Sequence, residues 1–344
     1  MEFHVTLSRP VAAVATAAAA LLALAACSSG GSAEEAPASA ATAGEPAPVT
    51  IQHAFGSTTI PEQPENVVTL GWGSTEAALA LGVVPLGIES QTYAADEHGQ
   101  LPWVAEALTD AGAEPTMLPA TVEEPAYEQI GALAPDLILA PYSGITAEQY
   151  ELLSEIAPTV AYPEEPWTTP WRDVITTVGT ALGVPDKADT LVGDLDAQIT
   201  EAAQAHPELA GKTVAAVWDL SGTFYVYKAQ DSRVDFLLDL GLVSAPAVDE
   251  LATDEESFVY TLSTEETDRL DSDILVNYAS TQEEVDTFLG KSYAQAIPAV
   301  QAGAVANITG DQLIAAMSPP TALSIDWGLD TYVDLLSKAA ATVK

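Results

Sequence analysis

Basic side chains are scarce in this sequence. Its 344 residues include 10 Lys and Arg against 50 Asp and Glu, which gives a formal net charge of −40. Proteins that bind nucleic acid need clustered Lys and Arg to neutralise phosphates, and the sequence contains no such cluster. We therefore exclude nucleic acid as a partner. The acidity is interpreted as solubility or adaptation to salt, with attraction of a cationic ligand as the alternative.

Histidine and cysteine are also scarce. The four histidines, His4, His53, His98 and His206, are scattered, and Cys27 is the single cysteine. Zinc sites use His, Cys and carboxylate ligands at close spacing, and the sequence shows no such group, so we expect no direct metal site. Haem would need an axial His or Tyr ligand, and the 11 tyrosines keep that alternative open. A single cysteine excludes an internal disulfide bond.

The N-terminus has the parts of an export signal. Arg9 precedes an Ala-, Val- and Leu-rich run over residues 11–26, and a positive start, a short apolar stretch and small residues at its end are typical of a secretory signal. The run ends Leu-Ala-Ala-Cys, which resembles a bacterial lipobox. We predict that residues 1–26 are a signal peptide and that Cys27 carries a lipid (palmitate) anchor on the extracytoplasmic face of the membrane. The alternative is a plain signal peptide with a leftover thiol.

Residues 27–50 are predicted to be a disordered tether. After Cys27 they are mostly Ser, Gly, Ala, Glu and Pro with almost no large apolar side chain, so they cannot bury enough surface to fold. A flexible chain of about 20 residues has a root-mean-square reach of ~25 Å. Such a tether would let a lipid-anchored domain dock on a membrane partner.

Beyond residue 50, short apolar runs alternate with amphipathic helical patterns. We expect strands at 67–70, 84–88, 136–140, 158–161, 213–219, 274–277 and 304–308. We expect helices at 74–81, 101–110, 126–132, 146–156, 171–182, 187–205, 232–240, 264–270, 283–288, 293–301 and 326–341. This alternation predicts an α/β fold with parallel sheets covered by helices on both faces. Left-handed helix ends are predicted at Gly82, Gly183 and Gly241.

Two segments share a register, "YEQIGALAPDLILA" (127–140) and "STEETDRLDSDILVN" (263–277). In each, a Glu lies five residues before a Leu and eight before an Asp that opens an apolar strand. Both segments are therefore predicted to be a short helix that feeds a buried strand. This repeat, in a chain long enough for two lobes, indicates two Rossmann-like lobes built on the same plan.

The predicted lobes span residues 51–166 and 207–344, and a helical segment, 167–206, lies between them. No Gly-Ser linker interrupts that segment, so we expect a single rigid helix to hold the lobes at a nearly fixed separation. Because α/β sheets bind ligands outside the carboxyl ends of their strands, we expect the ligand cleft between the lobes.

The turn Gly71-Trp72-Gly73 lies between a predicted strand and helix, as a dinucleotide-binding loop would, and Glu89 lies at the distance of a ribose-binding acid. An exported Rossmann-like enzyme is therefore one alternative. However, Glu76 occupies the third glycine position, where a pyrophosphate needs bare N–H groups. Because hydrolase elbow, P-loop and H-E-x-x-H motifs are absent, we expect no catalytic residues, no enzyme activity and no cofactor. An adhesion lipoprotein would show repeats rather than one cleft.

Four segments carry a family resemblance: "AFGSTTIPEQPENVVTLGWGSTEAALALGVVPLGI" (54–88), "YEQIGALAPDLILA", "ADEHGQLPWVAEAL" (95–108) and "LLSEIAPTVAY" (152–162). Over nearly its whole length the chain resembles the iron-siderophore and cobalamin substrate-binding proteins of ABC importers. The resemblance implies two lobes joined by one long helix, small closure on binding and a ferric siderophore as ligand. It also implies delivery to a membrane permease. We expect a monomer, and haem or cobalamin is the alternative ligand.

The resemblance also implies that one glutamate on top of each lobe pairs with arginines of the permease. By position these are Glu128 and Glu265. A carboxylate in the first turn of a helix is favoured by the helix dipole, and an exposed one can meet a guanidinium group. The alternative is that both are ordinary helix-start acids. Ser263 and Glu266 form a capping-box pattern, which would leave Glu265 free.

Aromatic side chains suit a large ligand with apolar arms and a polar iron centre. The candidate ligand-binding residues are Trp72, Trp103, Tyr142, Trp167, Trp218, Tyr225, Tyr227, Arg233, Tyr278 and Trp327. Trp72 is favoured because it follows the first strand, although each ring could equally belong to core or loop packing. Asp219 and Asn277 could add polar contacts.

The few available cations are Arg172, Lys228 and Arg233. A ferric tris-catecholate is a trianion and would need several converging arginines, and a ferric citrate-type ligand raises the same objection. A neutral or cationic ferric hydroxamate fits the sequence better.

Overall fold

The computed structural model describes residues 48–120, 124–252 and 258–343. The predicted signal peptide, Cys27 and most of the tether lie outside the described residues. Strand β1 (Val49–His53) begins inside the last two residues of the predicted tether. Within the described ranges, no helix is both long and apolar enough to cross a membrane.

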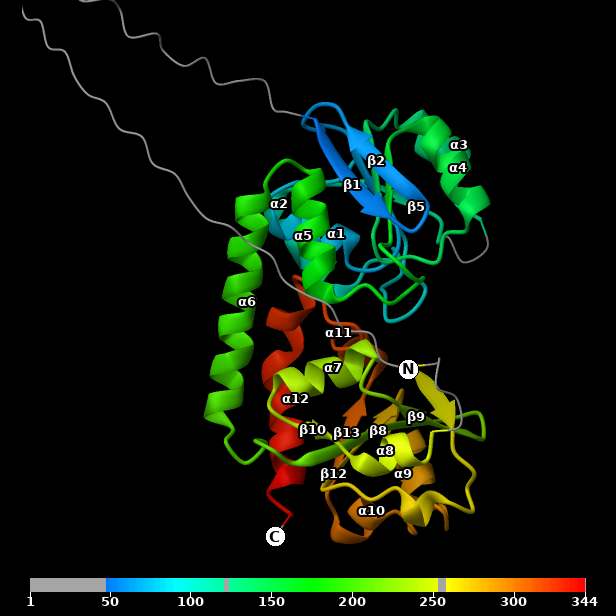
Figure 1. Ribbon diagram of the computed structural model, residues 1–344, viewed down its shortest axis with the longest axis vertical. Coiled ribbons are helices and arrows are strands. Elements are labelled where there is room, and N and C mark those ends of the chain that lie inside the picture. The colour runs from blue at the N-terminus through cyan, green and yellow to red at the C-terminus, as the bar shows by residue number, and fades with distance from the viewer. Residues whose placement is uncertain (1–47, 121–123, 253–257, 344) are drawn as a thin grey trace, which may run out of the picture. The chain divides into compact units, whose positions relative to one another are not determined.

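The first sheet has five parallel strands in the order β5-β4-β3-β6-β7. It lies in the upper part of Figure 1, where β5 is labelled. Its strands are β3 (Val67–Thr69), β4 (Gly87–Glu89), β5 (Thr116–Leu118), β6 (Leu137–Ala140) and β7 (Thr159–Ala161). Helices α1 (Ser74–Ala80), α2 (Pro102–Ala111), α3 (Tyr127–Ala132) and α4 (Ala147–Ile156) alternate with them. All strands except β5 are buried throughout, as expected for parallel strands covered on both faces. The short, half-exposed β5 had no apolar run to predict it.

A hairpin of β1 and β2 (Gly56–Ile60) lies beside β7. His53 is buried in it and its Nε2 lies 2.9 Å from the Thr58 hydroxyl. Thr58 in turn donates to the Thr159 carbonyl at 2.5 Å. Burial lowers the pKa of His53, so this histidine is a structural residue of the hairpin.

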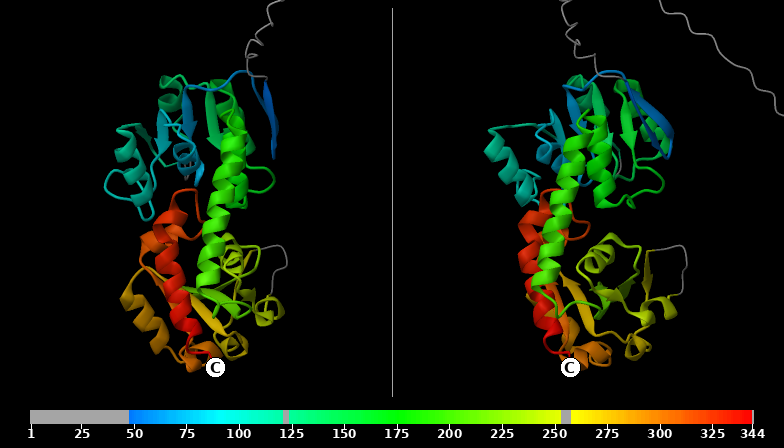
Figure 2. Two further views of the ribbon diagram at one scale, coloured as in Figure 1. Left: turned by 90° about the vertical axis from the view of Figure 1, so that its left-hand side faces the viewer. Right: turned by 60° about the vertical axis from the view of Figure 1, so that its left-hand side comes forward.

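Helices α5 (Trp171–Ala181) and α6 (Pro185–Ala205) connect the first sheet to the second (Figure 2). The two helices pack so closely at Gly179 that a Cβ on this residue would lie 2.3 Å from the Cβ of Ala188. Helix α6 is 21 residues long and begins two residues earlier than predicted, with Pro185 in its first turn, where proline loses no helical hydrogen bond. The left-handed helix ends predicted at Gly82, Gly183 and Gly241 are confirmed, with φ of 84°, 72° and 88°.

The second sheet is mixed rather than parallel, which corrects the prediction. Its path is β11-β9-β8-β12-β13, with β10 beside β8. The strands are β8 (Thr213–Leu220), β9 (Thr223–Tyr227), β10 (Val243–Ser244), β11 (Val259–Thr261), β12 (Ile274–Ala279) and β13 (Val305–Thr309). Strands β9 and β11 run antiparallel to their neighbours. The cause is a two-residue hairpin at Ser221-Gly222, where both φ angles are positive, as the type I′ turn requires.

The helices of the second half are α7 (Ser232–Asp239), α8 (Pro246–Glu250), α9 (Gln282–Gly290), α10 (Pro298–Ala302), α11 (Asp311–Ala316) and α12 (Ser324–Ala340). The helix predicted at 264–270 is wrong, since only a 3-10 turn, η1 (Thr267–Arg269), forms there. The Thr267 hydroxyl donates to the Tyr293 carbonyl at 2.8 Å and ties this turn to a distant part of the chain. The helix predicted at 293–301 starts only at Pro298.

The two repeat segments make the same backbone contact. The carboxylate of Asp136, just before β6, accepts the N–H groups of Glu65 and Asn66 at 2.9 Å each. The carboxylate of Asp273, just before β12, accepts the N–H of Thr213 at 2.8 Å. Each aspartate thus ties the start of its own strand to the start of the neighbouring strand, β3 or β8.

Candidate functional site

A cleft of about 480 Å³ is lined by residues from both halves of the chain. The first half contributes Trp72, Tyr93, Tyr142, Trp167, Thr168, Pro170 and Trp171. The second half contributes Ala229, Gln230, Asp231, Ser232, Arg233, Asp235, Phe258, Ser318 and Pro319. We call the five aromatic residues of the first half the aromatic wall. Asp231, Ser232, Arg233 and Asp235 form the polar wall.

Trp72 lies in the cleft lining because of the glycine before it. Gly71 has a φ of 75°, and a Cβ there would lie 2.3 Å from the Tyr142 carbonyl oxygen. The Trp72 N–H donates to that same carbonyl at 2.9 Å. Its indole N–H donates to the Pro319 carbonyl at 3.2 Å. The half-buried ring therefore both lines the cleft and ties the turn after β3 to the loop that precedes α12.

The other acids near this turn are structural. Glu76 is buried in the first turn of α1 and its Oε1 accepts the Trp103 indole N–H at 3.1 Å. Burial raises the pKa of Glu76, while hydrogen bonds from Trp103, Thr321 and the first-turn backbone oppose that shift. Glu89 accepts the N–H of Gly71. Both acids brace the turn, and Glu76 occupies the N–H groups that a pyrophosphate would need.

Tyr142 and Trp167 meet edge to face, with ring centroids 5.7 Å apart at 67°. Burial raises the pKa of Tyr142 to about 12, and a hydrogen bond with Ser232 from the polar wall partly opposes that rise. Trp167 is 47% exposed. It can lie against the backbone of Gly144, because a Cβ there would come within 2.4 Å of the indole nitrogen. The aromatic wall thus presents one buried and one open ring side by side.

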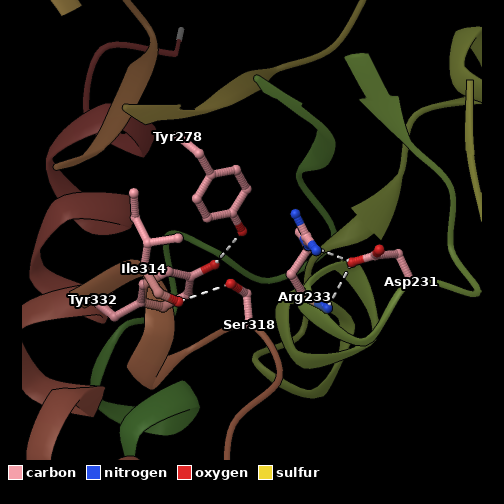
Figure 3. Close-up of polar contacts among 6 residues, drawn as sticks. All are labelled: Asp231, Arg233, Tyr278, Ile314, Ser318 and Tyr332. Atoms are coloured by element: carbon pink, nitrogen blue, oxygen red, sulfur yellow. Dashed lines mark hydrogen bonds and ion pairs between the residues drawn. The ribbon is translucent and has the colours of Figure 1, made fainter. Parts of the chain in front are cut away.

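The polar wall is built on the N-terminus of α7 (Figure 3). Asp231 caps the helix, because its carboxylate accepts the backbone N–H of Arg233 at 3.0 Å. The same carboxylate oxygen lies 2.6 Å from Nε of Arg233, with side-chain exposures of 3% and 17%. The guanidinium carbon is 4.0 Å from the Tyr227 ring centroid and 5.8 Å from that of Tyr278. Arg233 is therefore held on three sides by one carboxylate and two rings.

The protonation states of this pair follow from burial and mutual charge. Burial raises the pKa of Asp231 and the guanidinium of Arg233 opposes that rise. Burial lowers the pKa of Arg233, but the Asp231 charge and the surrounding tyrosines outweigh it and leave the pKa raised. An arginine stays charged in a protein, so the geometry is that of an ion pair. Behind it, the hydroxyls of Tyr278 and Tyr332 lie 3.1 Å apart in the core (Figure 3).

Six predicted ligand residues do not line the cleft. Tyr227 and Tyr278 lie behind Arg233, as a second layer. Trp103 is buried, bonds Glu76 and packs against Trp327 with centroids 5.4 Å apart. Trp218 and Tyr225 are half-buried on the second sheet. Trp327 lies on α12 and is 38% exposed. For these six, direct ligand contact is not supported by their positions.

The predicted polar candidates other than Arg233 have structural partners. Asp219 accepts from Lys291 at 2.7 Å and from Tyr293 at 2.5 Å. The Asn277 amide donates to Asn307 at 2.9 Å, across the β12–β13 pair. Arg172 pairs with Asp196 of α6 at 2.6 Å and with Asp239 of α7 at 2.9 Å. Lys228 is buried and does not line the cleft.

The sequence reasoning missed Tyr93, Trp171 and Phe258. Tyr93 lies in the loop after β4, and its hydroxyl bonds Asp311 from the second half; burial and that carboxylate raise its pKa. Its place just beyond a strand end was the same signal that favoured Trp72. Trp171 begins α5, and Phe258 directly precedes β11, a strand that no apolar run predicted. Among the described residues, no group of three or more His, Cys, Asp or Glu side chains could hold a metal ion.

The two predicted docking glutamates are both exposed but differ in setting. Glu128 lies in the first turn of α3. Glu265 lies in the turn before η1, and its N–H donates to the Ser263 hydroxyl at 3.3 Å. The predicted capping box is wrong, because Glu266 pairs with Arg269 at 2.5 Å instead. Glu265 is thus exposed, but no helix dipole supports it.

Comparison with known proteins places these features in context. Residues 67–311 match the family model described as periplasmic binding protein. The chain is 31% identical over 192 residues to the probable siderophore-binding lipoprotein YfiY of Bacillus subtilis, an alignment that covers 55% of each protein. It is 26% identical over 213 residues to the ferric-anguibactin-binding protein FatB of Vibrio anguillarum, covering 60% of this chain and 61% of that protein. The chain therefore matches less than two thirds of either relative's length.

Solved structures show the same fold over more of the chain. Streptococcus pneumoniae PiaA in complex with ferrichrome is 34% identical, with a TM-score of 0.77 over 86% of this chain and 100% of that one. Staphylococcus aureus SirA complexed with staphyloferrin B is 22% identical, with a TM-score of 0.66 over 85% of this chain. The latter likeness bears on the fold alone.

Proposed function

The chain belongs to the periplasmic binding protein family, and from that premise we propose that it captures a ferric siderophore outside the cytoplasm and delivers it to an ABC permease. The observation that carries this proposal is the cleft between the aromatic and polar walls. Its size, about 480 Å³, lies in the range of small-molecule sites. Its lining combines six aromatic side chains with seven polar or charged ones, and small-molecule sites likewise combine aromatic surface with polar groups that fix the ligand. The protein binds its ligand and performs no chemistry on it.

We propose further that the ligand is a ferric hydroxamate. Of the described residues that line the cleft, Arg233 is the one cation, and it pairs with Asp231. The same lining holds a second carboxylate, that of Asp235. A trianionic tris-catecholate would therefore meet no net positive charge there. A neutral or cationic ferric hydroxamate would meet no such penalty, and the ferrichrome bound to PiaA supports this class.

The test is a titration of intrinsic tryptophan fluorescence in the purified protein with ferrichrome, a ferric tris-catecholate, cobalamin, haem and NAD. Trp72 and Trp167 line the cleft, so a bound iron chelate should quench them. We expect saturable quenching by ferrichrome at the lowest concentration. Saturation by cobalamin or haem with no siderophore binding would contradict the proposal, and binding of NAD would favour the enzyme class.

Delivery to the permease rests on the two exposed glutamates. We propose that Glu128 and Glu265 meet guanidinium groups of the permease, one from each lobe. Lobes at 51–166 and 207–344, joined through 167–206, would present both carboxylates at once if α6 resists bending. This proposal includes a monomer with small closure on binding.

Anchoring rests on Cys27, which we propose to be lipidated after removal of residues 1–26. Cys27→Ala should release the protein from the membrane fraction, because a cleaved chain without its lipid would have no anchor. Membrane retention of this variant in cell fractionation would contradict the proposed anchor.

A further inference from the structure

We propose that Asp231 determines which ligand charge the cleft accepts, by neutralising the guanidinium of Arg233. This inference rests on the proposed function, because it assigns the determinant of ligand class within that same cleft. It concerns a residue that sequence reasoning did not single out and whose side chain is only 3% exposed.

Asp231 engages Arg233 twice. One carboxylate oxygen accepts the Arg233 N–H at 3.0 Å and lies 2.6 Å from its Nε. The faces of Tyr227 and Tyr278, at 4.0 and 5.8 Å, limit the other directions in which the guanidinium could turn. The cation is therefore fixed in the wall of the cleft with a counter-charge already in place.

The helix cap alone does not require a carboxylate. Asn and Ser cap helices as well as Asp does, and a buried charge is costly unless it is paired. The negative charge of Asp231 is therefore explained by Arg233 rather than by α7. Without this charge, the cleft would present a buried cation that suits an anionic ligand.

The neighbouring charges do not compensate for such a change. Asp235, one turn along α7, lines the cleft but is exposed, so that water screens it. Asp311 bonds the hydroxyl of Tyr93 at the cleft and adds a further negative charge nearby. Asp231 is the buried member of this set and acts in the least screened position.

The experiment compares the affinities of neutral ferrichrome and of ferric enterobactin, a tris-catecholate trianion, for wild type and variants. Asp231→Asn keeps the helix cap and removes the charge. We expect the ratio of the two dissociation constants to shift toward the trianion by about tenfold or more, as expected for a poorly screened charge. Asp231→Ser, a second neutral cap, should shift the ratio in the same direction.

Asp235→Asn is the matched control, because it removes the same charge from an exposed position in the same wall. Its ratio should move by less than about threefold. The double variant Asp231→Asn with Arg233→Gln restores neutrality, so its ratio should return to within about threefold of wild type, even where both affinities fall. Melting temperatures of all variants verify folding.

The inference is overturned if both Asp231 variants fold and keep the wild-type ratio, or if Asp235→Asn shifts it equally. Persistence of the shift in the double variant would also overturn it, because the effect would then not pass through Arg233. These outcomes differ from failure of the proposed function, in which wild type binds neither ferric chelate.

Discussion

The two walls of the cleft differ in chemistry as well as in origin. The first half of the chain supplies five aromatic side chains and no charge, while the second half supplies all three charged side chains in the lining, from one turn of α7. Aromatic rings offer large contact areas that tolerate many ligand shapes. Charges discriminate between ligands through complementarity. We therefore expect most of the affinity to come from the first half and most of the selectivity from the second.

The largest effect is expected where both halves must act together, at the permease. Glu128→Ala with Glu265→Ala should abolish siderophore uptake by cells and leave the affinity for ferrichrome unchanged, because both carboxylates are exposed. The matched control is Glu124→Ala with Asp268→Ala, two exposed acids close by in the sequence. Loss of ferrichrome affinity in the purified double variant, or equal loss of uptake in the control, would contradict the docking role.

The next largest effect should follow loss of Trp72 from the aromatic wall. Trp72→Ala removes a ring that lines the cleft and a hydrogen bond to Pro319, so ferrichrome affinity should fall about 100-fold, as for a central aromatic contact. Trp72→Phe should lower the ferrichrome affinity less than Trp72→Ala does. Trp327→Ala serves as control, since that ring lies off the cleft lining, and equal losses in both would break the assignment of the wall.

A smaller effect is expected at Trp167, the open ring of the same wall. Because this side chain is 47% exposed, Trp167→Ala should lower ferrichrome affinity by about tenfold and change the free energy of unfolding by less than about 0.5 kcal/mol. Titration calorimetry and chemical denaturation measure the two quantities. A large loss of stability with unchanged affinity would make Trp167 a structural residue.

The smallest effect concerns stability beneath the aromatic wall. Burial raises the pKa of Glu76, so the native state holds its proton more tightly than the unfolded chain. The stability of the native protein then decreases as pH rises from the ordinary glutamate pKa, about 4.3, through the raised native value. Glu76→Gln removes this loss, so the free energy of unfolding of the variant should rise relative to that of wild type as the pH passes through that window.

Denaturation of both proteins across the pH range tests this sign. A constant difference between them would show that the carboxyl does not titrate with folding. A wild type that gains on the variant with rising pH would show the opposite shift.

The fold was predictable where burial leaves a mark on the sequence. Strands β3, β6 and β12 are apolar runs buried on both faces, and the shared register around Asp136 and Asp273 marked equivalent strand starts. The antiparallel strands β9 and β11 were not predicted, although the Ser221-Gly222 dipeptide indicates a turn. The helix predicted at 264–270 was wrong, because only the 3-10 turn η1 forms there.

The site was only partly predictable because ring orientation depends on distant contacts. Trp72 was found from its place after β3. Trp103 was a secondary candidate, and its indole N–H bonds the buried Glu76, a contact that no sequence pattern indicates. Asp231 was missed because its role depends on a 2.6 Å contact with Arg233. In the sequence, an Asp two residues before an Arg is common at the start of a helix, so the pair did not stand out.

The most direct test of the central claim is native mass spectrometry of the purified protein in an equimolar mixture of ferrichrome, ferric enterobactin, cobalamin and haem. We expect one ferrichrome per chain as the dominant complex, and its loss in Trp72→Ala. A dominant complex with cobalamin, haem or the tris-catecholate, or no complex at all, would contradict the assignment of this cleft to a ferric hydroxamate.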